Sequence, residues 1–453
     1  MKLKKFIFLF LAVFIFACDK RTETGFELYR QEINRIIEVN NFLPEIWPGF
    51  DLKTNKCGIC FAGEGCVVFG KIDSLPKLQI KGINDDNLRV VNKNPIPVVE
   101  LQKIVKIDNE DVFFINYSNG DYFFVSDFIH ESFHFYQTKY FKMPDINNYS
   151  EDRYRETIVS DKSLALIILE NAILAKAILD FGNRKKHISD FIAVRNYRYS
   201  FEEKKIIKWE EALERFEGSA EYIAYKVSEK LGLKRMVFLT ALLDNTSKKW
   251  DAYSRFYGSG TSQIILLDDY KIDWKIKIEQ GYSPFEILKE CEKGEGSKLD
   301  DIFKRYDFKT MLAEARSLNI KNRNINREKS KLLEKGTVID IENLKIARWS
   351  NLLSLHPLDI VDSSEFHNNF CDIKFLPGTQ IINQLQFDFN PYKIYRILLP
   401  SDNIQILINN NRIFNSGKES FNSLDIKSPY FKFNLRKKGI IAKNGNKISI
   451  KIK

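Results

Sequence analysis

The sequence lacks the features that define several common classes of protein. After residue 17, no stretch approaches the 18 apolar residues that a membrane-spanning helix needs. There is no internal repeat and no low-complexity tract. The formal charge of +10 is spread over the chain without a nucleic-acid-binding motif. We therefore expect a globular protein with no nucleic-acid partner.

Cysteine is also scarce. Three of the six cysteines lie within ten residues: Cys57, Cys60 and Cys66. A zinc ribbon is excluded because no second Cys-x-x-Cys pair and no nearby histidine supplies the remaining ligands. The segment 57–66 instead predicts a hairpin that turns at 63–65, where Cys66 can form a disulfide with one of the other two cysteines. Cys291 and Cys371 are isolated in the sequence, and their pairing stays open.

The N-terminus has the composition of an export signal. Residues 1–5 are basic, 6–17 form an unbroken apolar run, and the run ends in Ile-Phe-Ala before Cys18. This ending resembles the bacterial lipobox. The resemblance implies a signal peptide over 1–17, cleavage before Cys18 and a lipid on its thiol. The protein would then be anchored to a membrane of the bacterial cell envelope, on the periplasmic or surface face. The alternative is a plain signal peptide with an incidental cysteine.

The first part of the mature chain mixes a helix with strands. Residues 18–53 predict a tether and a helix that ends near Asn40, followed by a turn rich in proline. From 54 onwards strands dominate, and apolar runs at 112–117 and 122–125 predict a hairpin around an Asn-Gly pair.

A helical pattern follows, and then a second region of strands. Ser126 or Asp127 is expected to cap a first helix. Further helices are expected at about 151–181, 202–231, 234–244, 258–270, 284–292 and 298–317. These close a domain over 54–318. Residues 319–335 are polar and predict a linker, while short apolar runs over 336–453 predict a β-sandwich-like domain.

Histidine is rarer still, with five in the chain, and two of them stand in the segment 130–134, His-Glu-Ser-Phe-His. On a helix, His130 and His134 point from the same face one turn apart, as two zinc ligands must. Glu131 lies beside them, where it can accept a proton from a water that zinc activates. Three aromatic residues are expected to seat the other side of the helix in the core: Phe133, Phe135 and Tyr136.

A third ligand is needed, and the sequence after His134 lacks the glycine and histidine of the metzincins. Residues 216–222 read Phe-Glu-Gly-Ser-Ala-Glu-Tyr. This segment resembles the third-ligand helix of the gluzincin aminopeptidases, the group that includes aminopeptidase N and the glycyl aminopeptidases. The resemblance implies that Glu217 binds zinc and that Gly218 lets two helices approach closely. Glu221 is the alternative ligand, or a partner that orients a histidine.

A second segment is similar to the same family. Residues 253–260 read Tyr-Ser-Arg-Phe-Tyr-Gly-Ser-Gly, like the Tyr-x-Lys-Gly helix start of these enzymes, with Ser259 in place of the usual lysine. The resemblance implies that Tyr257 donates a hydrogen bond to the oxyanion. The other interpretation of Tyr257 is a packed core aromatic.

The sequence also departs from that family. The hairpin at 114–121 lacks the Gly-x-Met-Glu-Asn strand that anchors a substrate's free amine, so exopeptidase specificity is not implied. Four polar residues can line a cleft or serve as structural partners: Asp127, Gln137, Arg195 and Arg198.

Together these patterns predict an α+β fold. A gluzincin-like catalytic domain, with a β-rich part first and the helices of the zinc site after it, precedes the C-terminal β domain. The predicted function is that of a zinc metallopeptidase that binds one Zn²⁺ and cleaves a peptide or protein substrate, with Glu131 as general base. One alternative is a non-catalytic, zinc-containing binding lipoprotein. Another is a zinc hydrolase of cell-wall peptide or another amide.

Overall fold

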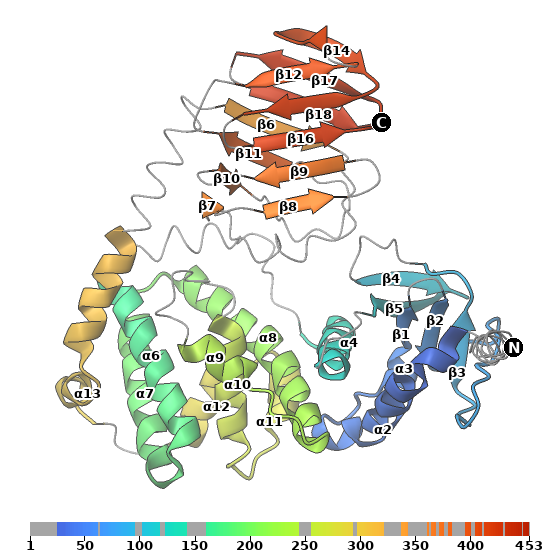
Figure 1. The fold of residues 1–453 in the computed structure, drawn as a ribbon. Coiled ribbons are helices and arrows are strands. Elements are labelled where there is room, and N and C mark those ends of the chain that lie inside the picture. Colours follow the sequence, from blue (N-terminus) through green and yellow to red (C-terminus); the bar gives the residue numbers. More distant parts are fainter. Residues whose placement is uncertain are drawn as a thin grey trace, which may run out of the picture. The chain divides into compact units, whose positions relative to one another are not determined.

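The structure is a computed structural model, and it describes most of the chain after residue 24. The described residues are 25–61, 64–95, 102–117, 123–142, 160–243, 255–292, 297–320, 337–342, 360–361, 364–367, 371–375, 379–382, 395–399, 404–409, 412–428, 431–445 and 447–452. The predicted signal peptide and Cys18 lie outside them. The described residues form helices and several small sheets, which confirms the predicted mixture of α and β structure (Figure 1). None of the described helices is both long and apolar enough to cross a bilayer.

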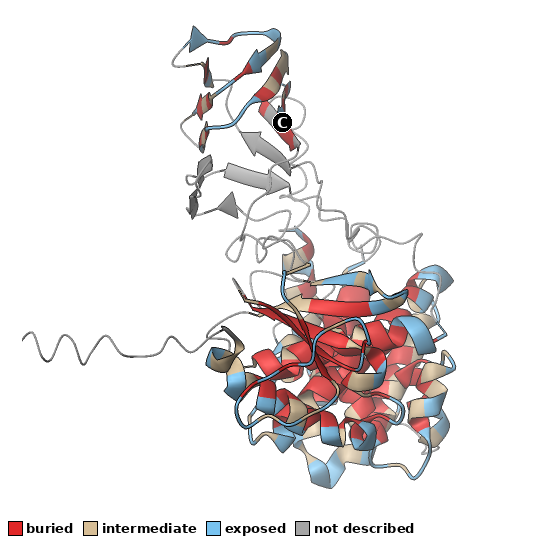
Figure 2. Cartoon of the chain, turned by 90° about the vertical axis from the view of Figure 1, so that its right-hand side faces the viewer, coloured by how far each residue is buried: buried red, intermediate tan, exposed pale blue. Residues whose placement is uncertain are grey.

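Contacts within the chain group it into two compact units. The first comprises 1–97, 101–136 and 223–233, and the second comprises 98–100, 137–222 and 234–453. The first unit holds a five-stranded sheet in the order β3-β2-β1-β5-β4. Its strands are β1 Cys57–Phe61, β2 Gly65–Phe69, β3 Leu88–Val91, β4 Gln102–Ile107 and β5 Glu110–Asn116. Strands β1 and β5 run parallel, and the other neighbours are antiparallel. Both β1 and β2 are buried along their whole length (Figure 2).

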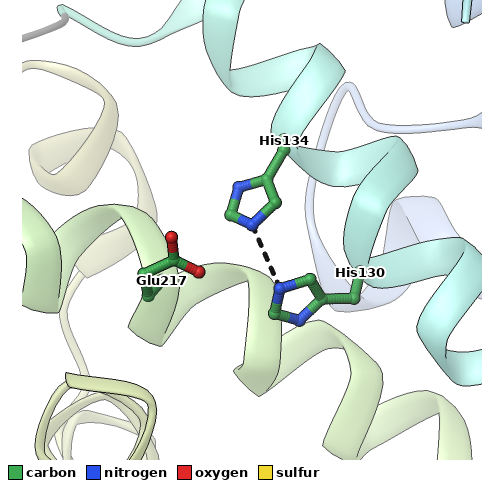
Figure 3. A group of neighbouring side chains, drawn as sticks. All are labelled: His130, His134 and Glu217. Carbon is green, nitrogen blue, oxygen red and sulfur yellow. Dashed lines mark hydrogen bonds between the residues drawn. The ribbon is translucent and has the colours of Figure 1, made fainter. Parts of the chain in front are cut away.

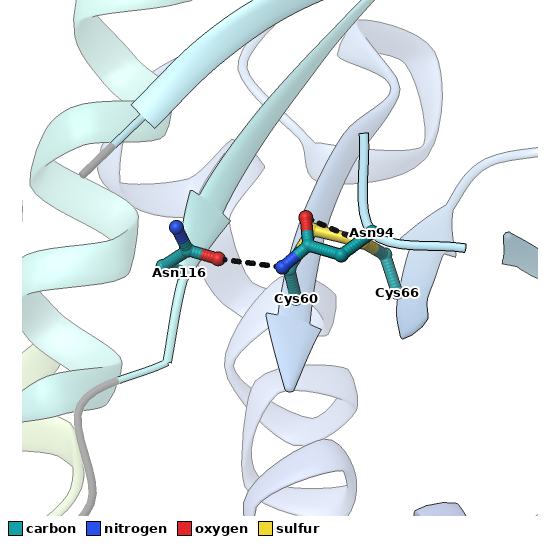
Figure 4. Close-up of a disulfide and its surroundings, with 4 residues drawn as sticks. All are labelled: Cys60, Cys66, Asn94 and Asn116. Atoms are coloured by element: carbon teal, nitrogen blue, oxygen red, sulfur yellow. Dashed lines mark hydrogen bonds between the residues drawn. A yellow bond between two sulfur atoms is a disulfide. The ribbon is translucent and has the colours of Figure 1, made fainter. Parts of the chain in front are cut away.

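The predicted hairpin of the cysteine segment is confirmed. Strands β1 and β2 pair in the register that places Cys60 opposite Cys66, and these two residues form a disulfide (Figure 4). The side chain of Asn94 lies beside this bond, with its Oδ1 3.8 Å from Cys66 Sγ. Its Nδ2 donates to Asn116 Oδ1 at 3.0 Å. The disulfide thus lies where β1, β2, the end of β5 and the segment after β3 meet.

The first long helix is longer than predicted. Helix α2 runs over Arg30–Ile46, past the expected end at Asn40, with Pro44 inside it. A proline lacks the N–H that would bond four residues back, but Trp47 N still donates to Leu43 O, so the last turn is retained. Leu43 and Ile46 are buried and extend the apolar face of the helix. A short helix, α3 Leu52–Asn55, follows the turn.

The predicted strand at 122–125 is wrong. Phe124 and Val125 begin helix α4, Phe124–Tyr140, and β5 pairs with β1 and β4 instead. A short aromatic run is compatible with a strand or a buried helix, and here both side chains are buried on the helix. Ser126 and Asp127 therefore lie inside α4 and do not cap it, and Asp127 N donates to Phe123 O at 2.9 Å.

Most of the predicted helices after residue 160 are present, with revised ends. They are α6 Asp161–Leu179, α8 Lys204–Lys230, α9 Val237–Leu243, α10 Arg255–Leu267, α12 Pro284–Cys291 and α13 Leu299–Arg305. Ser160 caps α6, and Gly232, with φ of 71°, follows the end of α8. The sequence reasoning missed α7 Arg184–Tyr199 and α11 Trp274–Glu279. Helical backbone also continues over 308–320.

The C-terminal region forms strands, as predicted. One sheet has seven strands in the order β14-β17-β18-β6-β11-β10-β7, and another has six in the order β13-β12-β15-β16-β9-β8. Their bounds are β6 Thr337–Glu342, β7 Ile360–Val361, β8 Ser364–His367, β9 Cys371–Phe375, β10 Thr379–Ile382, β11 Tyr395–Leu399, β12 Gln405–Ile408, β13 Arg412–Ile413, β14 Gly417–Phe421, β15 Leu424–Lys427, β16 Phe431–Leu435, β17 Gly439–Asn444 and β18 Lys447–Ile452. Alternate residues are buried in β15 and β18, so one face of each of these strands is covered. The sandwich-like packing and the domain boundaries stay predictions.

Candidate metal centre

Helix α4 is seated in the core by the aromatic residues that the sequence assigned to its inner side. Phe133 is fully buried and meets Trp47 and Phe50 edge to face, each at 5.0 Å between ring centroids. Phe135 stacks on Phe113 of β5 at 5.7 Å. Because these contacts fix the rotation of α4 about its axis, they also fix the direction of the opposite face.

That opposite face carries the two histidines. His130 and His134 lie one helical turn apart, and their Nε2 atoms are 3.0 Å from each other (Figure 3). The two rings are nearly perpendicular, at 83°. His130 is 4% exposed, and His134 is half-buried. Two imidazoles that direct the same nitrogen to one point have the arrangement of two ligands of one ion.

Helix α8 brings a carboxylate to the same point. Glu217 is 3% exposed, and a carboxylate oxygen of Glu217 and one ring nitrogen of each histidine all lie within 4.8 Å of one another. Figure 3 shows the three side chains converging from α4 and α8. The helices are joined just beyond this group by Gln137, whose Nε2 donates to Phe216 O and Ser219 Oγ, both at 2.8 Å. Gln137 is therefore a structural link.

Glu217 belongs to a row of four buried acids on α8. They are separated by four, three and four residues, which places them along one side of the helix: Glu210, Glu214, Glu217 and Glu221. None is more than 3% exposed. Buried carboxylates are stable only when a cation, a metal or several hydrogen bonds compensate their charge. The partner of each acid therefore decides its role.

Arginines compensate the first two acids. The buried network contains three acids and three arginines from four helices: Glu170, Arg195, Arg198, Glu210, Glu214 and Arg255. Arg195 donates two bonds to Glu214, at 2.6 and 2.9 Å. Burial raises the pKa of Glu210, but the charges of Arg198 and Arg255 outweigh it and lower the pKa to about 2. The network supports the structural interpretation of Arg195 and Arg198.

An arginine also meets the last acid of the row. Arg235 Nε and Nη2 donate to the two oxygens of Glu221, at 2.9 and 2.8 Å, and both side chains are buried. Glu221 is not part of the His130, His134 and Glu217 group. Of the two glutamates that the sequence offered as ligands, the structure therefore brings Glu217 to the histidines and pairs Glu221 with an arginine.

Tyr257 lies on helix α10, which crosses α8 beside this row. A Cβ atom on Gly218 would lie 2.5 Å from the backbone of Gly260, so the two helices are in direct backbone contact. Thr261 Oγ1 donates to Gly218 O at 3.1 Å. The close approach predicted for Gly218 is therefore made with α10. Tyr257 is half-buried and lies three residues before Gly260, one turn away on the same side of α10.

The donor set fits zinc. Zinc–nitrogen bonds of about 2.0–2.1 Å at tetrahedral angles place two ligand nitrogens roughly 3.3 Å apart. The Nε2 separation of 3.0 Å is close to that value, and a carboxylate oxygen of Glu217 lies within 4.8 Å of a ring nitrogen of each histidine. Two imidazoles and one carboxylate are a ligand set of catalytic zinc sites, in which a fourth position is left for water or substrate.

Glu131 also lies on α4, directly after His130, and it is half-buried. The sequence reasoning named Arg195 and Arg198 as possible structural partners, but it did not assign Arg235 and Arg255 to the buried acids or Gly260 to the helix contact. Their only sequence signal is the 4-3-4 spacing of glutamates on α8.

No protein-family model, curated protein or solved structure matches this chain. The function is therefore argued from the geometry of these residues.

Proposed function

We propose that this protein is a zinc-dependent peptide hydrolase of the gluzincin type, held at the bacterial cell envelope by a lipid on Cys18. The observation that carries the proposal is the convergence of two histidines and one buried glutamate. The Nε2 atoms of His130 and His134 are 3.0 Å apart, and a Glu217 oxygen lies within 4.8 Å of the group. This geometry and the His-Glu-x-x-His spacing support the same ligand set.

The residues of the site divide the chemical work. His130, His134 and Glu217 would hold the ion, which supplies a Lewis acid that polarises the scissile carbonyl and makes an attacking water more acidic. Glu131 accepts the proton of that water and passes it to the leaving amine. Tyr257 donates its hydroxyl hydrogen to the oxyanion that forms at the carbonyl. The buried Arg–Glu network keeps α8 and α10 in place during these steps.

Two alternatives differ in what happens at the same ion. A binding lipoprotein would hold zinc without turnover, and a hydrolase of cell-wall peptide or another amide would use the same residues on a different substrate. Endopeptidase or exopeptidase specificity is not assigned, because residues 114–121 lack the amine-anchoring motif of the similar family.

A metal analysis combined with a peptide-library digest tests the proposal. We expect one zinc ion per chain, cleavage of a subset of peptides, and loss of cleavage after chelation that zinc restores. Zinc binding with no cleavage of proteins, peptides or cell-wall fragments would support the binding lipoprotein. Cleavage confined to cell-wall peptide would support the second alternative. A chain that binds no zinc would refute all three.

A further inference from the structure

The turn between α6 and α7 exposes two large apolar side chains. Leu179 is 59% exposed and Phe181 is 75% exposed. They belong to residues 179–186, Leu-Asp-Phe-Gly-Asn-Arg-Lys-Lys, which we call the α6–α7 tip. Exposing Leu179 and Phe181 together costs free energy in water, and neither contributes to the core of the protein. Burial of both side chains in an apolar environment outside the chain would therefore be favourable.

Basic residues surround this apolar pair. Lys185 and Lys186 are exposed, and Arg184 lies over the ring of Phe181, 4.3 Å from its centroid. The acid within the tip, Asp180, accepts hydrogen bonds from Asn183 and shares one with His187. The tip thus has three cationic residues and one acid that is bonded within the turn. Arg184 also forms a salt bridge with Asp269 at 2.7 Å, so the exposed charges of the tip are those of Lys185 and Lys186.

The exposure comes from an ordered turn. Asn183 N donates to Asp180 O at 3.3 Å, and Asn183 Nδ2 donates to Asp180 Oδ2 at 2.9 Å. Arg184 Nε donates to Ala177 O at 3.0 Å, which ties the start of α7 to the end of α6. Because hydrogen bonds already fix the backbone of the turn, little conformational entropy is lost when Phe181 is buried in an apolar environment outside the chain.

The size and charge of the tip favour a lipid surface over a protein. A stable protein interface buries about 1,200 Å² or more in total, far beyond what two side chains on a sharp turn offer. A bilayer interface requires only a few apolar side chains that enter the headgroup region, with lysines beside them to contact anionic lipids. We propose that the α6–α7 tip docks on the surface of an anionic phospholipid bilayer.

This contact is independent of the proposed hydrolysis. It would act together with the proposed lipid on Cys18. A tether alone lets the body of the protein rotate freely, whereas a second contact presents one side of it to the membrane.

Amide hydrogen exchange of the full chain on vesicles tests the proposal. The probes are vesicles of phosphatidylcholine alone and of phosphatidylcholine mixed with phosphatidylglycerol. We expect exchange in 179–186 to slow on the anionic vesicles and to stay unchanged on the neutral ones. Lys185→Gln and Lys186→Gln should each weaken docking about fivefold, since one lysine near an anionic surface contributes about that factor. High salt should have the same effect.

Variants separate the tip from general adhesion to vesicles. The double variant Leu179→Ser, Phe181→Ser should lose the slowed exchange, and both positions are exposed, so the fold should be unaffected. The control is the double variant Ile413→Ser, Lys418→Gln, which lies outside the tip. Ile413 is 59% exposed, as Leu179 is, but it lies on β13. Cys18→Ala removes the proposed tether and should lower total binding while the charge dependence at the tip persists. Equal exchange of the tip on both vesicles would overturn the proposal. So would slowing that follows protein concentration without lipid, which would indicate contact between copies of the chain.

Discussion

Gly218 of α8 and Gly260 of α10 face each other where the two helices cross. A Cβ atom on Gly260 would lie 2.2 Å from the carbonyl oxygen of Glu214 and 2.8 Å from the Cα of Gly218. Both obstacles are backbone atoms, which cannot move aside as a side chain does. The crossing therefore sets the distance between the helix that carries Glu217 and the helix that carries Tyr257.

Substituting Gly260 by alanine should force these helices apart. We expect a loss of about 1–3 kcal/mol in the free energy of unfolding, as for other overpacked sites, together with weaker zinc binding. The control is Gly182→Ala, whose Cβ would meet only Asp180 Oδ1 at 3.6 Å. Urea unfolding of both variants is the measurement. Equal stability of the two would show that the crossing tolerates a methyl group.

The two candidate ligands on α8 should respond differently to the same change. Glu217→Gln should weaken zinc binding on the order of a hundredfold or more, because a charged ligand of the ion is lost. Glu221→Gln should instead leave Arg235 buried without its full counter-charge and cost about 3–5 kcal/mol of stability. Zinc titration and urea unfolding are measured on both variants. If zinc affinity falls only in Glu221→Gln, the assignment of Glu217 is wrong.

Glu131 and Tyr257 should affect the reaction and leave the metal in place. Glu131→Gln keeps the shape of the side chain but cannot accept a proton, so turnover should fall by roughly a hundred to ten thousand times with zinc content unchanged. Tyr257→Phe removes one donor and should slow turnover by a comparable or smaller factor. Both are measured as kcat on a cleaved peptide. Full activity of Glu131→Gln would refute its role as general base.

Glu211 should make the protein less stable as the pH rises. Burial and the charges of Glu286 and Glu214 raise the pKa of Glu211 to about 7, from an ordinary value of 4.5. Below pH 4.5 the folded and unfolded chains both carry the proton, so Glu211 has no effect. Between pH 4.5 and 7 only the unfolded chain releases it readily, and folding stability falls with rising pH.

Glu211→Gln removes this dependence. It should therefore raise the free energy of unfolding at pH 8 and leave it almost unchanged at pH 4. Urea unfolding at both pH values is compared with Glu203→Gln, an exposed acid near the start of the same helix. A gain of equal size at both pH values would contradict the raised pKa of Glu211.

The proposed anchor is tested at Cys18. When the chain is expressed in bacteria fed labelled palmitate, the label should appear on the mature protein and vanish in Cys18→Ala. The Cys291→Ala variant is the control, because it keeps the N-terminal segment intact. Mature protein that is unlabelled and released from membranes would contradict lipidation and favour a plain signal peptide.

Local patterns in the sequence predicted several elements correctly. The glycines between Cys60 and Cys66 predicted the hairpin, since a turn depends on neighbouring residues alone, but the partner of Cys66 stayed open between Cys57 and Cys60. The register of β1 and β2 decides it, because it places Cys60 opposite Cys66. The strand predicted at 122–125 failed because an aromatic run fits either a strand or a buried helix. In the structure Phe124 packs against Tyr117, with ring centroids 4.6 Å apart, and against Phe128 one helical turn later.

By itself, the sequence determined that His130 and His134 share one face of a helix, because a separation of four residues closes one turn. It also placed four glutamates along one side of α8. It could not decide from spacing which of those acids meets the histidines, since all four have the same local pattern. The tertiary structure decided it: α7, α10 and the segment after α8 bring arginines to Glu210, Glu214 and Glu221, while α4 brings the two imidazoles to Glu217. Each of these contacts joins residues distant in the chain, so it depends on how the helices pack and on no local sequence signal.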